Sequence, residues 1–228
     1  MNAQVVFFDI GNTLAATGNQ SARRQFAGRL QLTEKETRAV GRLIMTHPAK
    51  SPEEIVTTLV PALPRHRSQQ IRTAVNDIWK QQTAAVQEIP GARGLLQGLK
   101  HMGLNLGVIS NTWHPSYEGF RLNCPHLTKL LDFSFLSYRE GWKKPSQELF
   151  EAAVHKAGCP AEACWMVGDS YELDLEPARI LGMRTLWVLC RPECERPLLA
   201  EILRGEKPGP DWAVQELGEI LPLFQNLS

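Results

Sequence analysis

The stretch VVFFDIGNTL, residues 5–14, decides the fold of this chain. Its first four residues are β-branched or aromatic, which is the composition of a strand buried on both faces of a sheet. The strand ends at Asp9, and small and polar residues follow. A carboxylate in that position lies where α/β folds bind their ligands, so we interpret Asp9 as a nucleophile. From this stretch alone, a turn-capping aspartate is the alternative.

Composition limits the class of protein. The 228 residues are 43% hydrophobic and 21% charged, which is enough to bury the core of one large or two small domains. With 25 basic and 24 acidic residues, a net charge of +1 and no long block of like charge, the chain lacks the pattern of a nucleic-acid-binding or membrane-surface protein. We therefore expect a small solute as partner, with no nucleic acid and no membrane; the sequence predicts no oligomeric state.

The first residues and the cysteines predict a cytoplasmic location. Residues 1–10 carry no cationic leader, and their apolar run is too short for a signal segment. The five cysteines contain no Cys-x-x-Cys pair and have no histidine at zinc-finger spacing. We interpret them as buried reduced thiols: Cys124, Cys159, Cys164, Cys190 and Cys194.

Between about residues 19 and 88, the sequence predicts helices joined by polar turns and no strand. Residues 33–36 (TEKE) form a capping box, and residues 51–54 (SPEE) combine a serine cap with a proline in the first turn. A further helix is predicted from about residue 68 towards residue 87. This part of the chain is therefore expected to be all helical.

Beyond residue 90, helical and strand-like segments alternate, as in a parallel sheet with helices on its faces. The predicted strands are 104–109, 133–137, 164–167, 185–189 and 212–214, and the predicted helices are 91–102, 146–157, 172–181 and a last one ending near 224. Together with a strand over residues 4–9, they predict an α/β fold. It has a doubly wound parallel-sheet (Rossmann-like) core, residues 1–15 and 89–228, and a small inserted all-helical cap domain, residues 16–88. Because the insertion follows the Asp9 turn directly, the cap is expected to act as a lid over the strand ends.

Polar residues follow three of the later predicted strands at their carboxyl ends. The segments are 110–112 (SNT), 143–145 (KKP) and 168–174 (GDSYELD). Singly, each has an ordinary explanation as a strand cap, a helix cap or a solvated lysine. Because the carboxyl ends of parallel strands meet at one edge of a sheet, we expect these segments to lie beside Asp9.

In their order along the chain, these segments resemble the four motifs of the haloacid dehalogenase-like superfamily of aspartate-nucleophile hydrolases. The motifs are matched by residues 9–14, 108–111, 144–145 and 168–174, and the helical insertion is similar to the family's small cap. The resemblance covers nearly the whole chain. It implies a Mg²⁺-dependent phosphatase that hydrolyses a small phosphomonoester or acyl phosphate through an aspartyl phosphate.

The resemblance also implies a role for each matched residue. The implied groups are catalytic Asp9, Ser110 and Lys144; phosphate-binding Thr13, Ser110, Asn111 and Lys144; and the Mg²⁺ ligands Asp9, Gly11, Asp169 and Asp174. Gly11 is expected to contribute its backbone carbonyl. Asp174 is expected either to bind the ion directly or to orient a metal-bound water.

The sequence departs from the family at Gly11, where its phosphatases usually carry a second aspartate that acts as general acid and base. Loss of such a group costs about 100-fold to 10,000-fold in rate. The preferred interpretation is still a phosphatase, acting on a good leaving group or taking its proton from elsewhere, for example from the substrate or a cap residue. His114 is a candidate for a substitute acid, and a solvated loop histidine is the alternative interpretation of this residue. The alternatives are a 2-haloacid dehalogenase, which needs no metal, and a catalytically weak phosphate-binding or regulatory protein. Retention of Asp169 and Asp174 favours the phosphatase.

Substrate selection is assigned to the cap. Asn19, Gln20, Arg23 and Arg24 are expected on the first cap helix, where an arginine is suited to bind a carboxylate or a second phosphate of the substrate. Trp113, after the second core strand, is interpreted as an apolar wall of the site or as packing beneath the cap.

Overall fold

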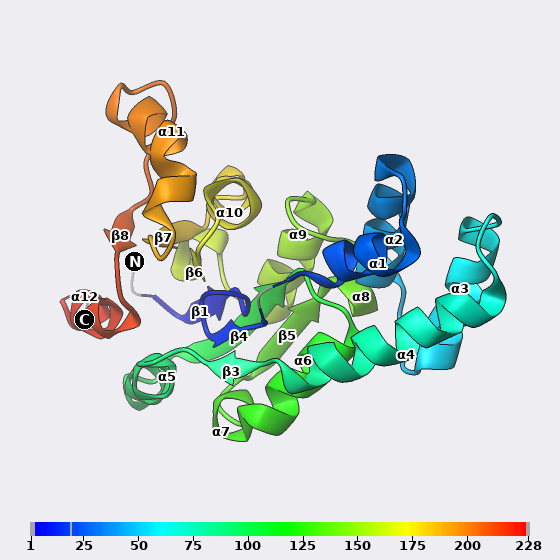
Figure 1. Cartoon of the computed structure of the whole chain (residues 1–228). Helices are drawn as coiled ribbons and strands as arrows, with labels where there is room; N and C mark the ends of the chain where they lie inside the picture. Colours follow the sequence, from blue (N-terminus) through cyan, green and yellow to red (C-terminus); the bar gives the residue numbers. More distant parts are fainter. Residues whose placement is uncertain (1–2, 19, 227–228) are drawn as a thin grey trace.

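One parallel β-sheet forms the centre of the protein (Figure 1). The structure is a computed structural model and describes residues 3–18 and 20–226. The sheet has the strand order β5-β4-β1-β6-β7-β8, and all neighbouring strands are parallel. The strands are β1 (Val5–Phe8), β4 (Asn105–Ser110), β5 (Phe133–Leu136), β6 (Cys164–Gly168), β7 (Arg184–Val188) and β8 (Trp212–Val214). The predicted α/β core is confirmed, including its edge strand.

β1 lies in the middle of the sheet because all four of its side chains are apolar and buried. Its register sets Phe8 beside Val108 of β4 on one side and Val167 of β6 on the other. The chain therefore leaves β1, β4 and β6 at the same edge of the sheet, and the polar residues after these strands converge there.

Helices cover both faces of the sheet, as Figure 1 shows. Because side chains alternate along a strand, Val6 and Phe8 pack in one cluster with α5 and α12, and Val5 and Phe7 pack in another with α9 and α10. The bounds are α5 (Ala92–His101), α9 (Gln147–Ala157), α10 (Glu176–Ile180) and α12 (Ile220–Gln225). The sheet is therefore buried between two helical layers.

The helices of the core depart from the prediction in three places. The predicted helix 172–181 is divided into a π-helical segment, η2 (Tyr171–Leu175), and α10. The segments expected as connections after β4 and β7 contain α6 (His114–Asn123) and α11 (Pro192–Leu203). Two short helices complete the core, α7 (Pro125–Thr128) and α8 (Ser137–Glu140). A π-helical turn is frequent at functional sites, and this one carries Asp174.

The insertion contains the predicted helices. They are α1 (Ala22–Leu30), α2 (Glu34–Thr46), α3 (Pro52–Ala62) and α4 (Ser68–Ala84). The helix starts at Thr33 and Ser51 are confirmed, since each hydroxyl accepts a hydrogen bond from the backbone N–H three residues later, at 3.3 Å. Pro61 lies in the last turn of α3.

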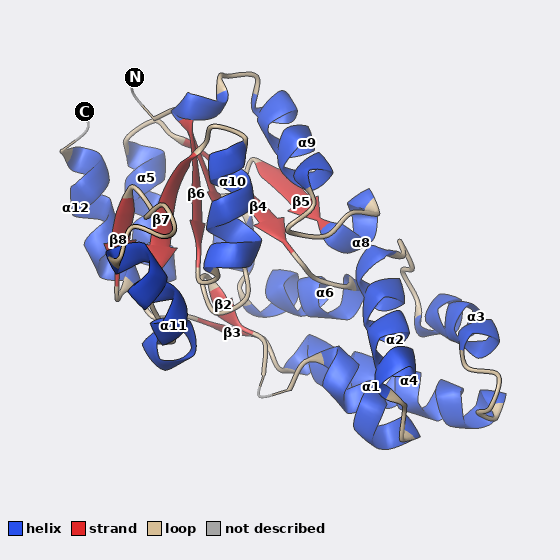
Figure 2. Ribbon diagram, turned by 90° about the horizontal axis from the view of Figure 1, so that it is seen from above, coloured by secondary structure: helices blue, strands red, loops and turns tan. Residues whose placement is uncertain are grey.

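A two-stranded ribbon joins the insertion to the core (Figure 2). It consists of β2 (Ala15–Ala16) and the antiparallel β3 (Gln87–Glu88). The expectation of no strand up to residue 88 is therefore wrong for β3, which is too short to show a period in the sequence. We propose that this ribbon marks the boundary between the core and the cap, as the predicted division at residues 15/16 and 88/89 requires.

The cap and the core also meet through side chains. Trp113, which follows β4 in the core, is buried in the apolar cluster of the cap. Its ring lies edge-on to Phe26 and Trp79, with centroids 6.1 and 5.6 Å away. Of the two interpretations of Trp113, the structure shows packing beneath the cap.

α4 of the cap packs along α6 of the core, and Gly119 permits this approach. A Cβ at residue 119 would overlap the carbonyl oxygen of Thr83 and lie 2.9 Å from Cγ2 of Val86. We expect Gly119→Ala to lower the free energy of unfolding by about 1–3 kcal/mol, because overpacking forces the helices apart. Thermal unfolding measures this effect.

Gly94→Ala is the matched control for that variant, since Gly94 also lies in a core helix and a Cβ there would meet nothing within 4 Å. We expect it to be neutral or stabilising by about 0.5–1 kcal/mol, because alanine is the better helix former. Equal stability of the two variants would contradict the tight α4–α6 contact.

Two further observations concern the sequence predictions. Among the helices of residues 3–18 and 20–226, none combines the length and apolar character needed to cross a membrane.

All five cysteines are free thiols. Cys124 and Cys164 are buried as expected and Cys159 is half-buried, but Cys190 and Cys194 are exposed, so the expectation of buried thiols is wrong for these last two.

Candidate active site

A cavity of about 380 Å³ opens at the carboxyl ends of β1, β4 and β6. Asp9, directly after β1, lies at its base and is 8% exposed. Its backbone N–H donates to the carbonyl oxygen of Val167 at 2.9 Å, which continues the β1–β6 pairing to this residue. The predicted nucleophile is therefore held by the sheet and opens into a cavity.

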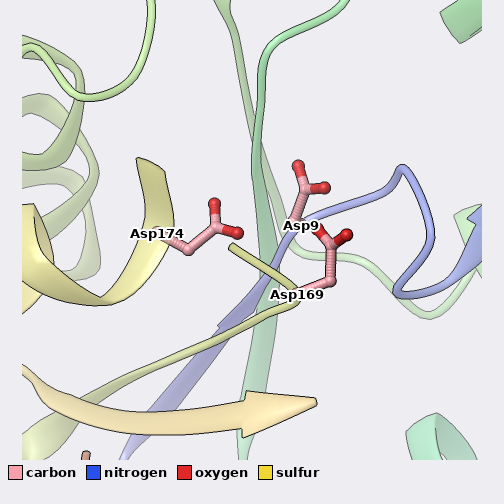
Figure 3. A group of neighbouring side chains, drawn as sticks. All are labelled: Asp9, Asp169 and Asp174. Carbon is pink, nitrogen blue, oxygen red and sulfur yellow. The ribbon is translucent and has the colours of Figure 1, made fainter. Parts of the chain in front are cut away.

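Three carboxylates gather in this cavity (Figure 3). Asp9 follows β1, Asp169 follows β6, and Asp174 comes from η2. One oxygen from each lies within 4.8 Å of the others, and all three residues are buried. Like charges at this separation repel strongly at low dielectric, so the cluster needs cations.

Lys144 supplies the first cation. Its ammonium group donates to Asp9 Oδ1 at 2.6 Å, to Asp174 Oδ1 at 2.5 Å and to the Ile109 carbonyl at 2.9 Å, and the side chain is 2% exposed. Burial acts to lower the pKa of Lys144, but Asp174 and Asp9 outweigh it and raise the pKa above its ordinary value. Lys144 is therefore charged and shared between two of the three carboxylates.

Asp174 is fixed in the cluster from two sides. Its Oδ2 accepts a hydrogen bond from the Ser170 backbone at 3.0 Å, and its Oδ1 accepts one from Lys144. Burial raises the pKa of Asp174; Asp9 acts in the same direction, and Lys144 opposes both. Gly168 leaves the room that Asp174 occupies, because a Cβ there would lie 2.6 Å from Cβ of Asp174.

Asp169 has two partners that the sequence analysis missed. Asn12 donates from Nδ2 at 3.2 Å, and Arg191 forms an ion pair with the same carboxylate oxygen. Burial raises the pKa of Asp169, as does Asp9, whereas Arg191 and Asn12 act to lower it. Asn12 has φ +56°, a left-handed conformation that asparagine tolerates. Arg191 follows β7. Its position after a predicted strand could have identified it from the sequence as a candidate site residue.

The donor set suits a hard divalent cation. Carboxylate oxygens from Asp9, Asp169 and Asp174 are the ligand type that Mg²⁺ prefers. Gly11 also lines the cavity, and its carbonyl oxygen accepts no hydrogen bond within residues 3–18 and 20–226. Lys144 and Arg191 balance two of the three negative charges, which leaves the cluster with a net negative charge.

The implied phosphate-binding residues differ in their surroundings. Ser110 lines the cavity, and its hydroxyl has no hydrogen-bond partner in the described chain. The side chain of Asn111 instead holds the backbone of Lys144, accepting from its N–H at 2.7 Å and donating to its carbonyl at 3.0 Å. Thr13 is fully buried, its hydroxyl lacks a partner among the described atoms, and it does not line the cavity.

The position of the missing aspartate is open. A Cβ on Gly11 would meet a single atom within 4 Å, Asp9 Oδ2 at 3.7 Å. His114, suggested as a substitute acid, does not line the cavity and stacks on Trp79 with ring centroids 5.4 Å apart. Burial lowers the pKa of His114, which favours its neutral form.

The cap contributes Gln82 to the cavity, a residue that the sequence analysis missed. Gln82 accepts a hydrogen bond from Ser116 of α6 at 3.0 Å and donates to the Gln20 carbonyl at 3.2 Å. The sequence proposed several cap residues for substrate selection. Arg23 lines a second cavity that adjoins this one, whereas Arg24 lines a third cavity. Asn19 lies outside the described residues.

Together these features define a class of protein: a doubly wound α/β fold with a buried aspartate directly after its central strand, a buried lysine and an acidic cluster at the carboxyl edge of its sheet. The profile of the haloacid dehalogenase-like hydrolases matches residues 3–182, and the chain belongs to this family.

Similar proteins are known by sequence and by structure. The glyceraldehyde 3-phosphate phosphatase of Pyrococcus abyssi is 31% identical over 104 residues, 46% of this chain and 43% of that protein. The enzyme of the same name from Methanothermobacter thermautotrophicus is 28% identical over 195 residues, 81% of this chain and 85% of that one. The structure of a 2-haloacid dehalogenase from Pseudomonas syringae has a TM-score of 0.62 at 20% identity and covers 98% of both chains, which shows the fold alone. The match to the Pyrococcus protein spans less than half of its length.

Proposed function

We propose that this chain is a Mg²⁺-dependent phosphatase that hydrolyses a small phosphomonoester or acyl phosphate through an aspartyl phosphate on Asp9. The observation that carries the proposal is the contact between Asp9 and Lys144 inside the cavity. Lys144 fixes Oδ1 of Asp9, while Oδ2 accepts no hydrogen bond from the described residues. A carboxylate held through one oxygen presents the other for in-line attack on phosphorus. Similarity to glyceraldehyde 3-phosphate phosphatases supports the reaction class.

In the proposed reaction, Asp9 attacks phosphorus and forms an O–P bond while the bond to the leaving oxygen breaks. The leaving group keeps the electron pair of that bond. Water then attacks phosphorus, which releases inorganic phosphate and restores the Asp9 carboxylate. Lys144 offsets the negative charge of nucleophile and phosphoryl group, and the unpartnered Ser110 hydroxyl donates to a phosphoryl oxygen.

The cavity contains oxygen ligands suited to Mg²⁺. We assign Asp9, Asp169 and the Gly11 carbonyl as its ligands, with Asp174 beside them. The bound ion would supply positive charge to the phosphoryl oxygens. The nucleophilic role of Asp9 requires that one of its two carboxylate oxygens stay free of the ion.

The open space at Gly11 limits the leaving groups that this site can handle. An alkoxide needs a proton as it departs, and residue 11 carries no carboxyl group that could donate one. An acyl phosphate releases a carboxylate, which departs without a proton at neutral pH. We therefore propose acyl and activated phosphates as the substrates that turn over fastest.

Two other functions share the fold. A 2-haloacid dehalogenase needs no metal, whereas this cavity keeps the acidic cluster of Asp9, Asp169 and Asp174. A protein that only binds phosphate has no need for a nucleophile with a free oxygen beside a buried lysine. These two observations favour catalysis at phosphorus.

The test is phosphate release by the wild-type protein across acyl phosphates, sugar phosphates, nucleotides and p-nitrophenyl phosphate. We expect turnover of acyl and aryl phosphates that EDTA abolishes and Mg²⁺ restores, because the acidic cluster needs a cation to accept a phosphate dianion. Halide release from 2-chloropropionate without metal would instead establish a dehalogenase. If no phosphate is released from any of these substrates, the phosphatase proposal is contradicted and a phosphate-binding protein becomes the favoured interpretation.

A further inference from the structure

We infer that a second anion-binding subsite adjoins the candidate active site and selects substrates that carry a phosphate or carboxylate remote from the reacting phosphoryl group. The subsite is a cavity of about 700 Å³ between α1 and α2 of the cap and the loop that precedes Lys144 in the core. Its cationic lining residues are Arg23, Arg38, Arg42 and Lys143. This inference rests on the proposed function, whose substrate class it narrows.

The subsite directly adjoins the candidate active site. Ser21, Met45 and Asn111 line both cavities. Asn111 is hydrogen-bonded to the backbone of Lys144, whose side chain contacts Asp9. A ligand with its phosphoryl group at Asp9 can therefore extend past the shared wall into the second cavity.

Three of the four cations of the subsite have no carboxylate partner within the described residues. Arg38 pairs with Glu34 at 2.6 Å, but Arg23, Arg42 and Lys143 form no ion pair with any carboxylate among residues 3–18 and 20–226. No described aspartate or glutamate lines the cavity. Arg38 and Arg42 stand one turn apart on α2, an unfavourable spacing for like charges. An anionic ligand supplies the missing partner.

Packing places Arg23 in this cavity. A Cβ at Gly41 would lie 2.7 Å from Cδ and 3.1 Å from Cγ of Arg23, so the bare backbone of α2 at Gly41 receives the arginine stem. Arg23 lines this cavity together with Arg42. Arg24, the next residue of α1, lines a separate cavity with Gln20 and Gln81. The structure thus assigns Arg23 and Arg24 to different cavities, a distinction that the sequence alone does not make.

The chemistry of the cations indicates the ligand class. A guanidinium pairs through two parallel hydrogen bonds with either a phosphate or a carboxylate, and a lysine adds a point charge. Two arginines from the cap and one lysine from the core can hold one such anion between the modules. The inferred substrates are bisphosphates or phosphorylated acids.

The experiment compares kcat/KM within two pairs of substrates: fructose 1,6-bisphosphate with fructose 6-phosphate, and 3-phosphoglycerate with glycerol 3-phosphate. In at least one pair, we expect the wild type to have a higher kcat/KM for the substrate that carries a second anionic group. The expected ratio is about tenfold to a hundredfold, the usual effect of a charged hydrogen bond. A preference in the first pair identifies a phosphate as the remote anion, and a preference in the second identifies a carboxylate. Arg23→Gln and Arg42→Gln should each reduce the preference about tenfold.

Arg24→Gln is the matched control, because Arg24 is exposed on the same helix and lies outside both cavities. It should keep the wild-type preference. Equal kcat/KM within both pairs for the wild type, or equal losses in Arg23→Gln and Arg24→Gln, would overturn the subsite.

A failure of the proposed function gives a different result. In that case the wild type hydrolyses none of these compounds and not even p-nitrophenyl phosphate. Calorimetric binding of fructose 1,6-bisphosphate and fructose 6-phosphate tests the subsite without turnover, both in that case and where the wild type hydrolyses p-nitrophenyl phosphate but is too slow on these four alkyl phosphates. Tighter binding of the bisphosphate that Arg23→Gln removes supports the subsite, and equal binding of the two sugars refutes it.

Discussion

Asp9→Asn is expected to reduce phosphate release by about a thousandfold or more, because an amide cannot form the aspartyl phosphate. The fold should persist. Lys144 keeps its contacts with Asp174 and Ile109, and the variant removes one of three mutually repelling carboxylates. Steady-state turnover of an acyl phosphate and thermal unfolding measure the two effects, with the melting temperature expected within about 3 °C of the wild type.

Asp77→Asn is the control for that variant, since Asp77 is a cap carboxylate that pairs with Arg29 at the surface. It should retain full activity. Rapid quenching followed by mass spectrometry should find one added phosphoryl group in the wild-type protein, located on Asp9, and none in Asp9→Asn. Retention of a tenth or more of the activity by Asp9→Asn would exclude Asp9 as the nucleophile.

Gly11→Asp is expected to raise the turnover of sugar phosphates by about a hundredfold, because it adds a general acid where the alkoxide leaves. The structure offers room, since a Cβ at residue 11 meets only Asp9 Oδ2, at 3.7 Å. A new carboxyl beside Asp9 has a raised pKa and stays protonated to higher pH. Turnover of sugar phosphates by this variant should therefore fall as the pH rises through that pKa.

Gly11→Asn is the matched control, because it adds a side chain of the same size without an acidic proton. It should not accelerate sugar phosphates. Acyl phosphates should respond little to either variant, since their leaving group needs no proton. Equal acceleration of all substrates by Gly11→Asp would mean that the new carboxylate acts on metal or substrate binding and not on the leaving group.

The core of the fold was predictable because it follows from short-range patterns. A buried apolar strand ending at Asp9 predicted the central strand, and segments after β4 and β6 were expected at the same edge. The structure brings Asp9, Lys144 and Asp174 into contact, as parallel pairing requires. Their catalytic roles stay proposals.

The remaining parts of the site depend on tertiary packing, which leaves no period in a single sequence. Arg191 contacts Asp169 from the segment after β7, and Gln82 lines the cavity from the C-terminal end of α4. Arg23 and Arg24 look alike in the sequence, and Gly41, on another helix, decides which of them faces the site. The π-helical turn at Asp174 likewise has no propensity signature distinct from an ordinary helix.

The burial of Trp113 among cap side chains has a consequence for exchanging caps between relatives. The apolar interior of α1–α4 is completed by a ring that the chain supplies more than twenty residues after the ribbon closes. A graft of residues 16–88 alone would leave a hole beside Phe26 and Trp79 in the transplanted module, and it would leave the indole of Trp113 without its packing partners in the core from which the module was taken. The transplantable unit is therefore discontinuous: the insertion together with the tryptophan that follows β4.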